Sequence, residues 1–438
     1  MAPWLPPILM LLFFFLAGLA FGIPMGFTMG VGSIITCATF YGIGQLQFAL
    51  TSTWNVMNSE SMLAVPMFIF MAIMLEQSGI ADDLYKALHH WMGGLNGGLA
   101  MATVIIAAIM GAMSGIAAAG TVTMALIALP VMLKKNYHKD LALGPILVGG
   151  PLGILIPPSV GFIIYGMLTD TSIGMLFAGG IVPGILLVTL YCLYFGIRCK
   201  FRPQDGPSLA PEERVSFKEK LKLTKGLVLP VLLVLAVLGS MFAGICSTAE
   251  SAAVGALGAI LCSVINKKFE WKMIGQGAIR TMETVGMILW ILFGANVFSS
   301  TVIVTGLPQV LNNFILGLDV PNIVIVFIMM FVYFILGMFL EETTMLYITV
   351  PIFMPILVSM GYDKLWFGII FMITMQMAYI TPPFGFSLFF LKGSAPEGVS
   401  TKDIYHAVPP LLIIQWIAVI LCMIFPQICT FLPNLMYR

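Results

Sequence analysis

Two pairs of adjacent prolines interrupt apolar sequence, Pro157-Pro158 and Pro382-Pro383. A helix cannot pass unbroken through such a pair, because both prolines lack an N–H group and the second restricts the backbone of the first. Carbonyl groups freed by a break at membrane depth are costly unless protein or a bound ion satisfies them. These residues therefore predict either a purely structural kink or a cage of backbone oxygens that suits a small cation.

Acidic residues in or beside apolar sequence are the second group that could do chemistry. Glu341 and Glu342 adjoin a glycine-bearing turn and predict a gating or ion-path role, whereas Glu250 lies in an interruption between two apolar stretches. The full set is Glu60, Glu76, Asp170, Glu250, Glu283, Glu341 and Glu342. Proton coupling through such a glutamate is the rival to coordination of a metal cation.

Basic and nucleophilic residues offer fewer possibilities. Lys392 follows the second proline pair by nine residues and is the nearest basic candidate for binding an anion, unless it extends to the membrane interface. Ser387 with the distant His406 could suggest an intramembrane serine protease, an alternative that we consider weaker than a carrier. The four histidines and seven cysteines predict neither a metal centre nor a disulfide framework. We therefore expect no enzyme and no organic cofactor.

The composition requires a membrane around these residues. The chain of 438 residues is 60% hydrophobic and 9% charged, against roughly 25% charged residues in soluble domains. Its mean hydropathy is +1.04. Without strand-like alternation, these values predict an all-α polytopic membrane protein in a lipid bilayer. The net charge of +1 gives no reason to expect a nucleic-acid partner.

The lengths of the apolar stretches predict about eleven transmembrane helices and two re-entrant hairpins. Residues 97–133 carry no charge, and as one helix they would reach about 55 Å against a hydrocarbon core of about 30 Å. The glycine-rich centre at 111–120 therefore predicts a hairpin turn, unless it serves ordinary small-residue helix packing. Apolar residues that recur at helical spacing among charges over 78–91 predict a helix along the membrane surface.

The only long hydrophilic stretch covers residues 198–225. It holds eight basic and four acidic residues, which places it in the cytoplasm by the positive-inside rule. It also divides the chain into two halves of similar length.

The sequence lacks a GxxxxGKS or GxxxxGKT loop, which would bind ATP, so an ion gradient must supply any energy for transport.

An internal repeat relates the two proline pairs. A shift of 225 residues superposes them, and it also aligns Met113 with Met338 and Pro130 with Pro355. Upstream the shift drifts to 227 residues, where Gly79 aligns with Gly306. Repeats with paired broken helices are typical of secondary transporters. The predicted organisation comprises N-terminal scaffold spans (1–75), a first repeat with its break at 153–158 (76–197), the basic loop (198–225), further scaffold spans with a connecting helix (226–300), and a second repeat with a hairpin near 337–342, a break at 378–384 and a C-terminal span (301–438).

Several motifs resemble one family, the large membrane subunit of tripartite ATP-independent periplasmic (TRAP) transporters. They cover nearly the whole chain: LAVPMF (63–68), GILIPPS (153–159), STAESAAVGA (247–256), GMFLE (337–341) and TPPFG (381–385). The chain departs from the family pattern at Asp170, where a glycine is usual. The resemblance implies an elevator-type carrier in a bacterial inner membrane, with two hairpins and two broken helices on its moving part.

The resemblance also implies a coupling ion, partners and site residues. Sodium-driven uptake of an organic acid, such as a C4-dicarboxylate or sialic acid, would require a small membrane subunit and a periplasmic substrate-binding protein. The implied first sodium site is Ser114, Gly153, Ile156 and Pro158, and the second is Gly337, Ala378, Thr381, Pro383 and Phe384. Candidates for substrate binding or gating are Ser159, Glu341, Glu342 and Lys392. A proton-coupled carrier of another anion and a pore-forming channel are the alternatives.

Overall fold

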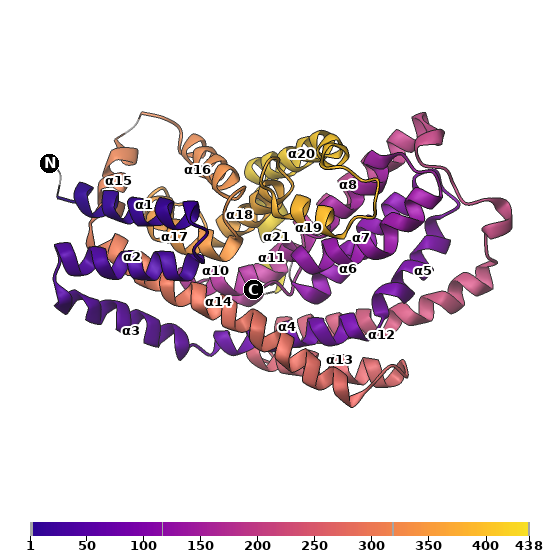
Figure 1. The fold of residues 1–438 in the computed structure, drawn as a ribbon, viewed down its shortest axis with the longest axis horizontal. Helices are drawn as coiled ribbons and strands as arrows, with labels where there is room; N and C mark the ends of the chain where they lie inside the picture. Colours follow the sequence, from indigo (N-terminus) through magenta and orange to yellow (C-terminus); the bar gives the residue numbers. More distant parts are fainter. Residues whose placement is uncertain (1–2, 116, 318, 437–438) are drawn as a thin grey trace.

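The computed structural model describes residues 3–115, 117–317 and 319–436, and within them every regular element is a helix (Figure 1). Seven helices are long and apolar enough to cross a membrane in this part of the chain, or nine if two bent pairs each count as one span. The all-α membrane class is therefore confirmed. The count of about eleven crossings stays a prediction, because five further apolar helices fall short of a full span.

The N-terminal helices and three helices from the middle of the chain pack together. Helix α14 contacts α2, α3 and α4, while α13 contacts α4. These helices follow the left and lower edges of Figure 1. Their bounds are α1 Leu5–Ala20, α2 Met25–Phe40, η1 Ile43–Gln45, α3 Leu46–Met57, α4 Ser61–Gln77, α12 Phe217–Phe242, α13 Thr248–Ile265 and α14 Trp271–Val304. We call them the scaffold helices.

The remaining helices form two series of the same order, each with a short helix, a hairpin, a broken helix and a long helix. The first series is α5 Ile80–Met92, α6 Gly98–Ser114, α7 Ala117–Lys134, α8 Lys139–Gly149, α9 Leu152–Leu155, α10 Val160–Thr169 and α11 Ile173–Phe201. The second is α15 Leu307–Leu316, α16 Asn322–Leu336, α17 Glu342–Ser359, α18 Lys364–Tyr379, α19 Phe386–Ser394 and α20 Thr401–Ile424, followed by α21 Gln427–Met436.

The short helices α5 and α15 begin in the same way, as the repeat predicts. Each starts after a glycine in the left-handed conformation, Gly79 with φ of 68° and Gly306 with φ of 74°. The preceding hydroxyls, Ser78 Oγ and Thr305 Oγ1, each donate a 2.6 Å hydrogen bond to the carbonyl three residues earlier. Each connection thus turns the chain sharply away from a scaffold helix, α4 or α14, into its repeat.

The predicted hairpin turns are present in both repeats. Helix α6 ends at Gly115, whose φ is 63° and whose N–H donates to the Gly111 carbonyl at 2.7 Å. The second turn covers residues 337–341, where Gly337 ends α16 and Glu341 precedes α17. The two repeats interlock, because α7 packs against α19 and α17 packs against α10.

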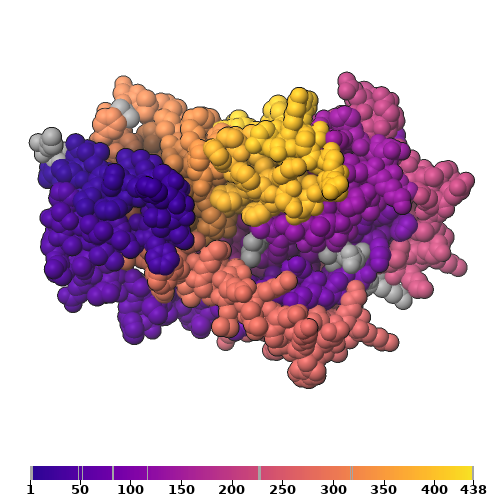
Figure 2. Space-filling model, in the orientation of Figure 1, coloured from indigo at the N-terminus to yellow at the C-terminus, as the bar shows by residue number. Residues whose placement is uncertain are grey.

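The hydrophilic stretch is helical at both of its ends. Helix α11 continues to Phe201, and α12 begins at Phe217 after a capping box formed by Ser216 and Glu219. Between them lie two short turns, η2 Pro203–Asp205 and η3 Pro211–Glu213. The space-filling view shows this stretch and the first repeat at the end of the molecule opposite the N-terminal helices (Figure 2).

Candidate functional site

The first break separates α9 from α10 by an extended segment. Ile156 has an extended backbone, with φ of −82° and ψ of 121°, and Ser159 is extended as well. The Ser159 hydroxyl donates to the Ile154 carbonyl at 2.6 Å and accepts the Phe162 N–H at 3.4 Å, so it caps α10. Ser159 is therefore occupied in holding the break open.

The first hairpin rests on this break through glycine-to-backbone contacts. A methyl group built on Gly111 would lie 2.5 Å from the Cα atom of Gly153. A methyl group on Gly115 would lie 2.8 Å from the Pro158 carbonyl oxygen. Such approaches are possible only without a side chain, which is the position-specific reason for glycine here. The hairpin tip and the break therefore form one compact unit.

The structure brings the residues of the predicted first sodium site to this unit. Ser114 precedes Gly115, and its hydroxyl donates a long hydrogen bond of 3.5 Å to the Gly111 carbonyl. The carbonyls of Gly153, Ile156 and Pro158 accept no hydrogen bond from the described part of the chain. Carbonyl oxygens that lack a donor are suitable ligands for a hard cation. The donor set thus fits sodium.

The predicted second site has the same arrangement with more internal partners. Gly337 approaches Ala378 so closely that an added methyl group would lie 2.7 Å from the Ala378 Cβ atom. The Thr381 hydroxyl donates to Met377 at 2.7 Å, while the Pro383 carbonyl accepts the Tyr405 hydroxyl at 3.0 Å. The Phe384 ring packs on Phe339 of the hairpin tip, with centroids 5.1 Å apart. Each carbonyl that accepts one bond retains a second lone pair for an ion.

One cavity of about 490 Å³ collects residues from both repeats and from the scaffold. The first repeat contributes Gly115 and Val160, and the second contributes Glu341, Glu342, Tyr379 and Phe386, while the opposite wall includes Trp290 of α14. Its volume falls within the range of small-molecule sites, roughly 300–1,000 Å³. The two hairpin tips, which are distant in sequence, therefore meet at a shared space.

Of the two glutamates at the second hairpin tip, Glu342 is buried and Glu341 is half-buried. Glu342 is only 6% exposed, and its backbone N–H donates to the Tyr379 hydroxyl at 3.1 Å. Oε1 of Glu341 accepts the Thr343 hydroxyl at 2.9 Å. The other carboxylate oxygen of each has no hydrogen-bond partner within the described residues. The sequence interpretation that these acids adjoin the hairpin turn is confirmed, although their chemical role remains a prediction.

Two other candidates lie apart from this cavity. The Lys392 ammonium, in the last turn of α19, donates to the Val399 carbonyl at 2.7 Å and does not line the cavity. Ser387 is fully buried, whereas His406 is exposed and lines a separate surface pocket with Tyr405. No hydrogen bond between Ser387 and His406 is found among the described residues. This geometry gives no support to a serine nucleophile.

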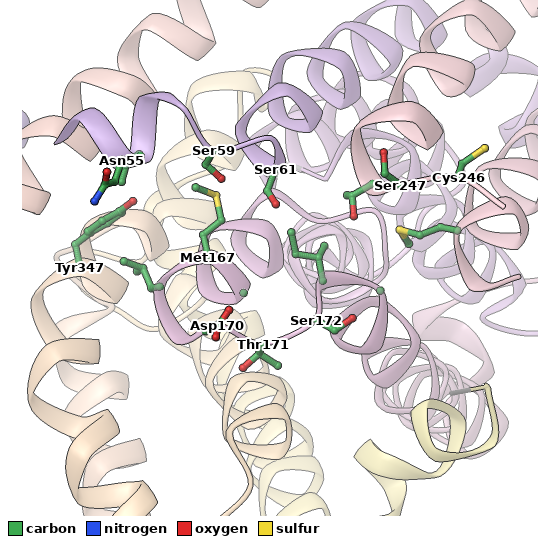
Figure 3. Close-up of a pocket in the computed structure, with 17 residues that line it drawn as sticks. Asn55, Ser59, Ser61, Met167, Asp170, Thr171, Ser172, Cys246, Ser247 and Tyr347 are labelled. Carbon is green, nitrogen blue, oxygen red and sulfur yellow. The ribbon is translucent and has the colours of Figure 1, made fainter. Parts of the chain in front are cut away.

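A second, polar cavity of about 580 Å³ lies where three helix connections meet (Figure 3). Its lining includes Asn55, Ser61, Ser172 and Ser247. At the turn between α10 and α11, Asp170 has a φ of 55°, the left-handed conformation that glycine adopts most readily. Asp170 therefore adopts the backbone conformation that would explain why the family usually has a glycine at this position.

Charges gather on the face that carries the basic stretch. Arg198 bonds Asp140 at 3.2 Å and lies 3.5 Å from Asp205. The hydrogen bond from Lys135 lowers the pKa of the exposed Glu213 carboxyl. Burial lowers the pKa of His89 to about 4, and the neighbouring His90 and Lys135 add to this effect. His89 is therefore neutral near pH 7.

Paired broken helices, two hairpins and a shared cavity are features typical of a membrane transporter. The family model of the tripartite ATP-independent periplasmic transporter, DctM component, matches residues 12–428. The chain therefore belongs to this family and is a large membrane subunit of a TRAP transporter. It is a transporter component and not an enzyme.

Individual relatives have different substrates in their names. The chain is 28% identical to the C4-dicarboxylate large permease DctM of Vibrio cholerae, with 97% of both chains covered. It is 28% identical to the ectoine large permease TeaC of Halomonas elongata, covering 96% of this chain and 97% of that one. It is 27% identical to the sialic acid large permease SiaM of Vibrio cholerae, covering 95% and 96%.

Two solved transporters share the fold. The YdaH transporter of Alcanivorax borkumensis superposes with a TM-score of 0.66 at 13% identity, and 98% of each chain is covered. MtrF of Neisseria gonorrhoeae superposes with a TM-score of 0.58 at 13% identity, covering 89% of this chain and 85% of that one. These likenesses support the all-helical transporter fold alone.

Sequence reasoning missed the residues that join the elements. Gly111 contacts Gly153, and an added methyl group on Gly161 would lie 3.2 Å from the Glu342 carboxyl carbon. Gly111 stands four residues before the turn glycine and Gly161 two residues after Ser159. Their positions near predicted breaks could have identified them as sites of close approach, but their partners could not have been read from the sequence.

Proposed function

We propose that this chain performs sodium-coupled uptake of a small organic acid. A periplasmic binding protein delivers the substrate, and a small membrane subunit completes the complex in a bacterial inner membrane. The observation that carries the proposal is the shared cavity of about 490 Å³, which is lined by the hairpin tips of both repeats and lies beside both breaks. A substrate in this space can contact the same elements that hold the coupling ions.

Sodium is favoured as the coupling ion by the chemistry of the breaks. The carbonyls of Gly153, Ile156 and Pro158 have no donor in the described part of the chain. An uncompensated carbonyl inside a membrane costs several kcal/mol, and sodium bound there would remove this cost. Ser114 would add its hydroxyl, and Thr381 with the carbonyls of the second break would hold a further sodium ion.

The interlocked repeats are the proposed moving part, and the scaffold helices are the fixed part. Helices α5 and α15 connect the two parts, since each follows a scaffold helix and precedes a hairpin. In the most apolar 18-residue stretch of the first broken helix, 94% of the residues are buried, which suits a unit that moves as a rigid body. The wall of the cavity formed by Trp290 belongs to the scaffold, so the cavity lies at the border between both parts.

The orientation follows from the basic stretch. Helix α11 has 29 residues and reaches about 44 Å, enough to cross the membrane from the basic stretch at Phe201. The polar cavity at its other end, near Ser172, then faces the periplasm. This cavity is the proposed side of substrate entry, because a soluble binding protein can reach it.

A small membrane partner is supported by a fused relative. The isethionate permease DctMQ of Oleidesulfovibrio alaskensis is 26% identical, and this chain covers only 67% of its length. The additional third of that chain leaves room for a small subunit. Large apolar side chains exposed on the scaffold, such as Phe13, Leu16 and Leu235, provide a surface for lipid and for such a subunit.

The test is uptake into proteoliposomes that contain this chain, its small subunit and the cognate binding protein. We expect uptake of the binding protein's ligand to follow an inward sodium gradient and to persist when a protonophore removes the proton gradient. Uptake that ignores sodium and follows protons would replace this proposal with proton coupling. The buried Glu342 and the half-buried Glu341, which both line the cavity, are the specific observation that favours this second candidate.

A further inference from the structure

The charge of the central cavity is unusual for a site that takes only anions. Glu341 and Glu342 line it, and the described residues that form its wall include no lysine, arginine or histidine. Two carboxylates without a cation repel a substrate dianion, because like charges at short range in a low dielectric interact strongly. Beyond the sodium ions proposed at the breaks, the cavity therefore favours a substrate that brings a positive charge of its own.

Glu342 occupies the positive end of a broken helix. An added methyl group on Gly161 would lie 3.2 Å from both the carboxyl carbon and Oε1 of Glu342. Gly161 is the second residue of α10, where the helix dipole stabilises a negative charge. The dipole offsets part of the cost of burying a negative charge on Glu342, and a cationic group beside the carboxylate would offset more of it.

Aromatic side chains continue from the same carboxylate. The Glu342 N–H donates to the Tyr379 hydroxyl, and the Tyr379 ring packs edge-on against Phe386 with centroids 5.4 Å apart. Tyr379, Phe386 and Trp290 all line the cavity. A carboxylate beside aromatic rings is the combination that recognises organic cations. Oε2 of Glu342 has no partner among the described residues and is available for such a group.

A place for a substrate carboxylate remains at the other broken helix. Helix α19 has nine residues and begins at Phe386 on the cavity wall, and its N-cap residue Gly385 offers no side-chain cap. The N–H groups of its first turn form a site for an anion. Ser387, in the same turn, does not line the cavity, but its fully buried hydroxyl has no partner within the described residues.

We propose that the substrate is a zwitterion, an organic acid that also carries a cationic nitrogen such as an amidinium or a quaternary ammonium group. The cation lies between Glu342 and the rings of Tyr379 and Trp290, and the carboxylate lies at the start of α19. This assignment rests on the proposed function, since it names the class of organic acid that the same cavity takes. It accounts for Glu342 on a cavity wall whose described residues include no basic side chain.

The test is ligand binding to the purified full-length chain, measured as a shift in melting temperature at a fixed sodium concentration. Two probes, ectoine and glycine betaine, are zwitterions, and the third, succinate, is a dianion. Each is used at millimolar concentration. We expect both zwitterions, or ectoine alone if the pocket selects by shape, to raise the melting temperature more than succinate does. Binding of succinate with no shift from either zwitterion would overturn the assignment, and so would no shift from any probe.

Variants at Glu342 sharpen the result. Glu342→Gln should weaken zwitterion binding by about tenfold or more, because it removes one partner of a buried charge pair. Glu342→Asp keeps the charge and should retain part of the affinity if the Gln variant fails to fold. Glu283→Gln is the matched control. Glu283 is exposed and does not line the cavity, although the next residue, Thr284, does, so this variant removes the same charge outside the proposed site. Equal zwitterion affinity in Glu342→Gln and Glu283→Gln would contradict the proposal.

The same samples separate this inference from sodium coupling. Sodium alone should raise the melting temperature of the purified chain whether or not a zwitterion binds. If sodium raises the melting temperature but succinate raises it more than the zwitterions do, the sodium coupling stands and the zwitterion proposal is rejected. If the zwitterions raise the melting temperature equally with and without sodium, the substrate class stands and sodium coupling is rejected.

Discussion

A methyl group at Gly111 should disconnect the first hairpin from the first break. In Gly111→Ala the new carbon would lie 2.5 Å from Cα and 2.7 Å from N of Gly153. Ordinary contacts between carbon atoms are about 3.5–4.0 Å, so the two backbones must separate by about 1 Å. Overpacking of this kind costs about 1–3 kcal/mol. The displaced group includes the Gly153 carbonyl, a proposed ligand of the first sodium ion.

The effect on sodium binding should exceed the effect on folding. A ligand at one hundred times its dissociation constant stabilises the folded state by about 2.7 kcal/mol, and each tenfold loss of affinity removes about 1.4 kcal/mol. We expect Gly111→Ala to lower the increase in melting temperature between potassium and sodium buffers by half or more. The assay is thermal unfolding of the purified chain in matched chloride salts, followed by sodium titration.

The matched control is Gly286→Ala in α14. A methyl group there meets no atom within 4 Å, so the substitution should leave the sodium shift unchanged. Removing a helix-interior glycine should stabilise this control by about 0.5–1 kcal/mol. If Gly111→Ala retained the full sodium shift while unfolding at a lower temperature, the contact with Gly153 would be structural and the first sodium site would lie elsewhere.

Three further substitutions test separate parts of the structure. Thr381→Val removes a buried hydroxyl and should raise the sodium concentration for half-maximal uptake about tenfold, whereas Thr381→Ser should retain the wild-type value. His89→Gln should reduce acid sensitivity: the folded-state pKa of about 4 lies below the unfolded value of 6.5, so stability falls as pH drops through this window, by about 1–2 kcal/mol after solvent screening. Thermal unfolding against pH, with exposed His406→Gln as the control, measures this slope. Lys392→Met should lower the melting temperature slightly and leave the substrate KM unchanged, because the ammonium binds Val399 outside the cavity; a large rise in KM would restore Lys392 as a substrate ligand.

The features that depend on local backbone chemistry could be predicted from the sequence. Adjacent prolines prevent a continuous helix, and the structure has breaks at both pairs. The uncharged length of residues 97–133 required a turn, which the structure places at Gly115. The shift that aligned Gly79 with Gly306 identified equivalent entries to the two repeats. In each case the deciding property belongs to one short segment.

Lys392 shows where spacing along the chain is insufficient. It follows the second proline pair by nine residues, which suggested a position near the site. Those residues form α19, and nine residues of helix extend over about 13 Å. The side chain consequently reaches the following loop, where it meets Val399. A prediction of this contact would have required the direction of α19 relative to the cavity.

The contact between Glu342 and Gly161 could not be predicted because it joins different repeats. Hydrophobic periodicity describes the face of one helix, and it contains no information about which helix will cover that face. The exchange that packs α17 against α10 and α7 against α19 is a tertiary relation. It changes the reading of the first break, since the positive end of α10 faces a glutamate instead of an open site.

The packing of the scaffold gives a physical reason for the location of the proposed movement. A methyl group on Gly294 of α14 would lie 1.9 Å from the Gly26 carbonyl of α2, so these two helices cannot slide without opening a close backbone contact. In the first repeat, which belongs to the proposed moving part, Gly111 and Gly153 hold the first hairpin against its break in the same way. Between these two rigid contacts lies the cavity wall shared by Trp290 and the second hairpin tip. Displacement of the repeats against the scaffold should therefore take place at the cavity, which lies between these two close backbone contacts.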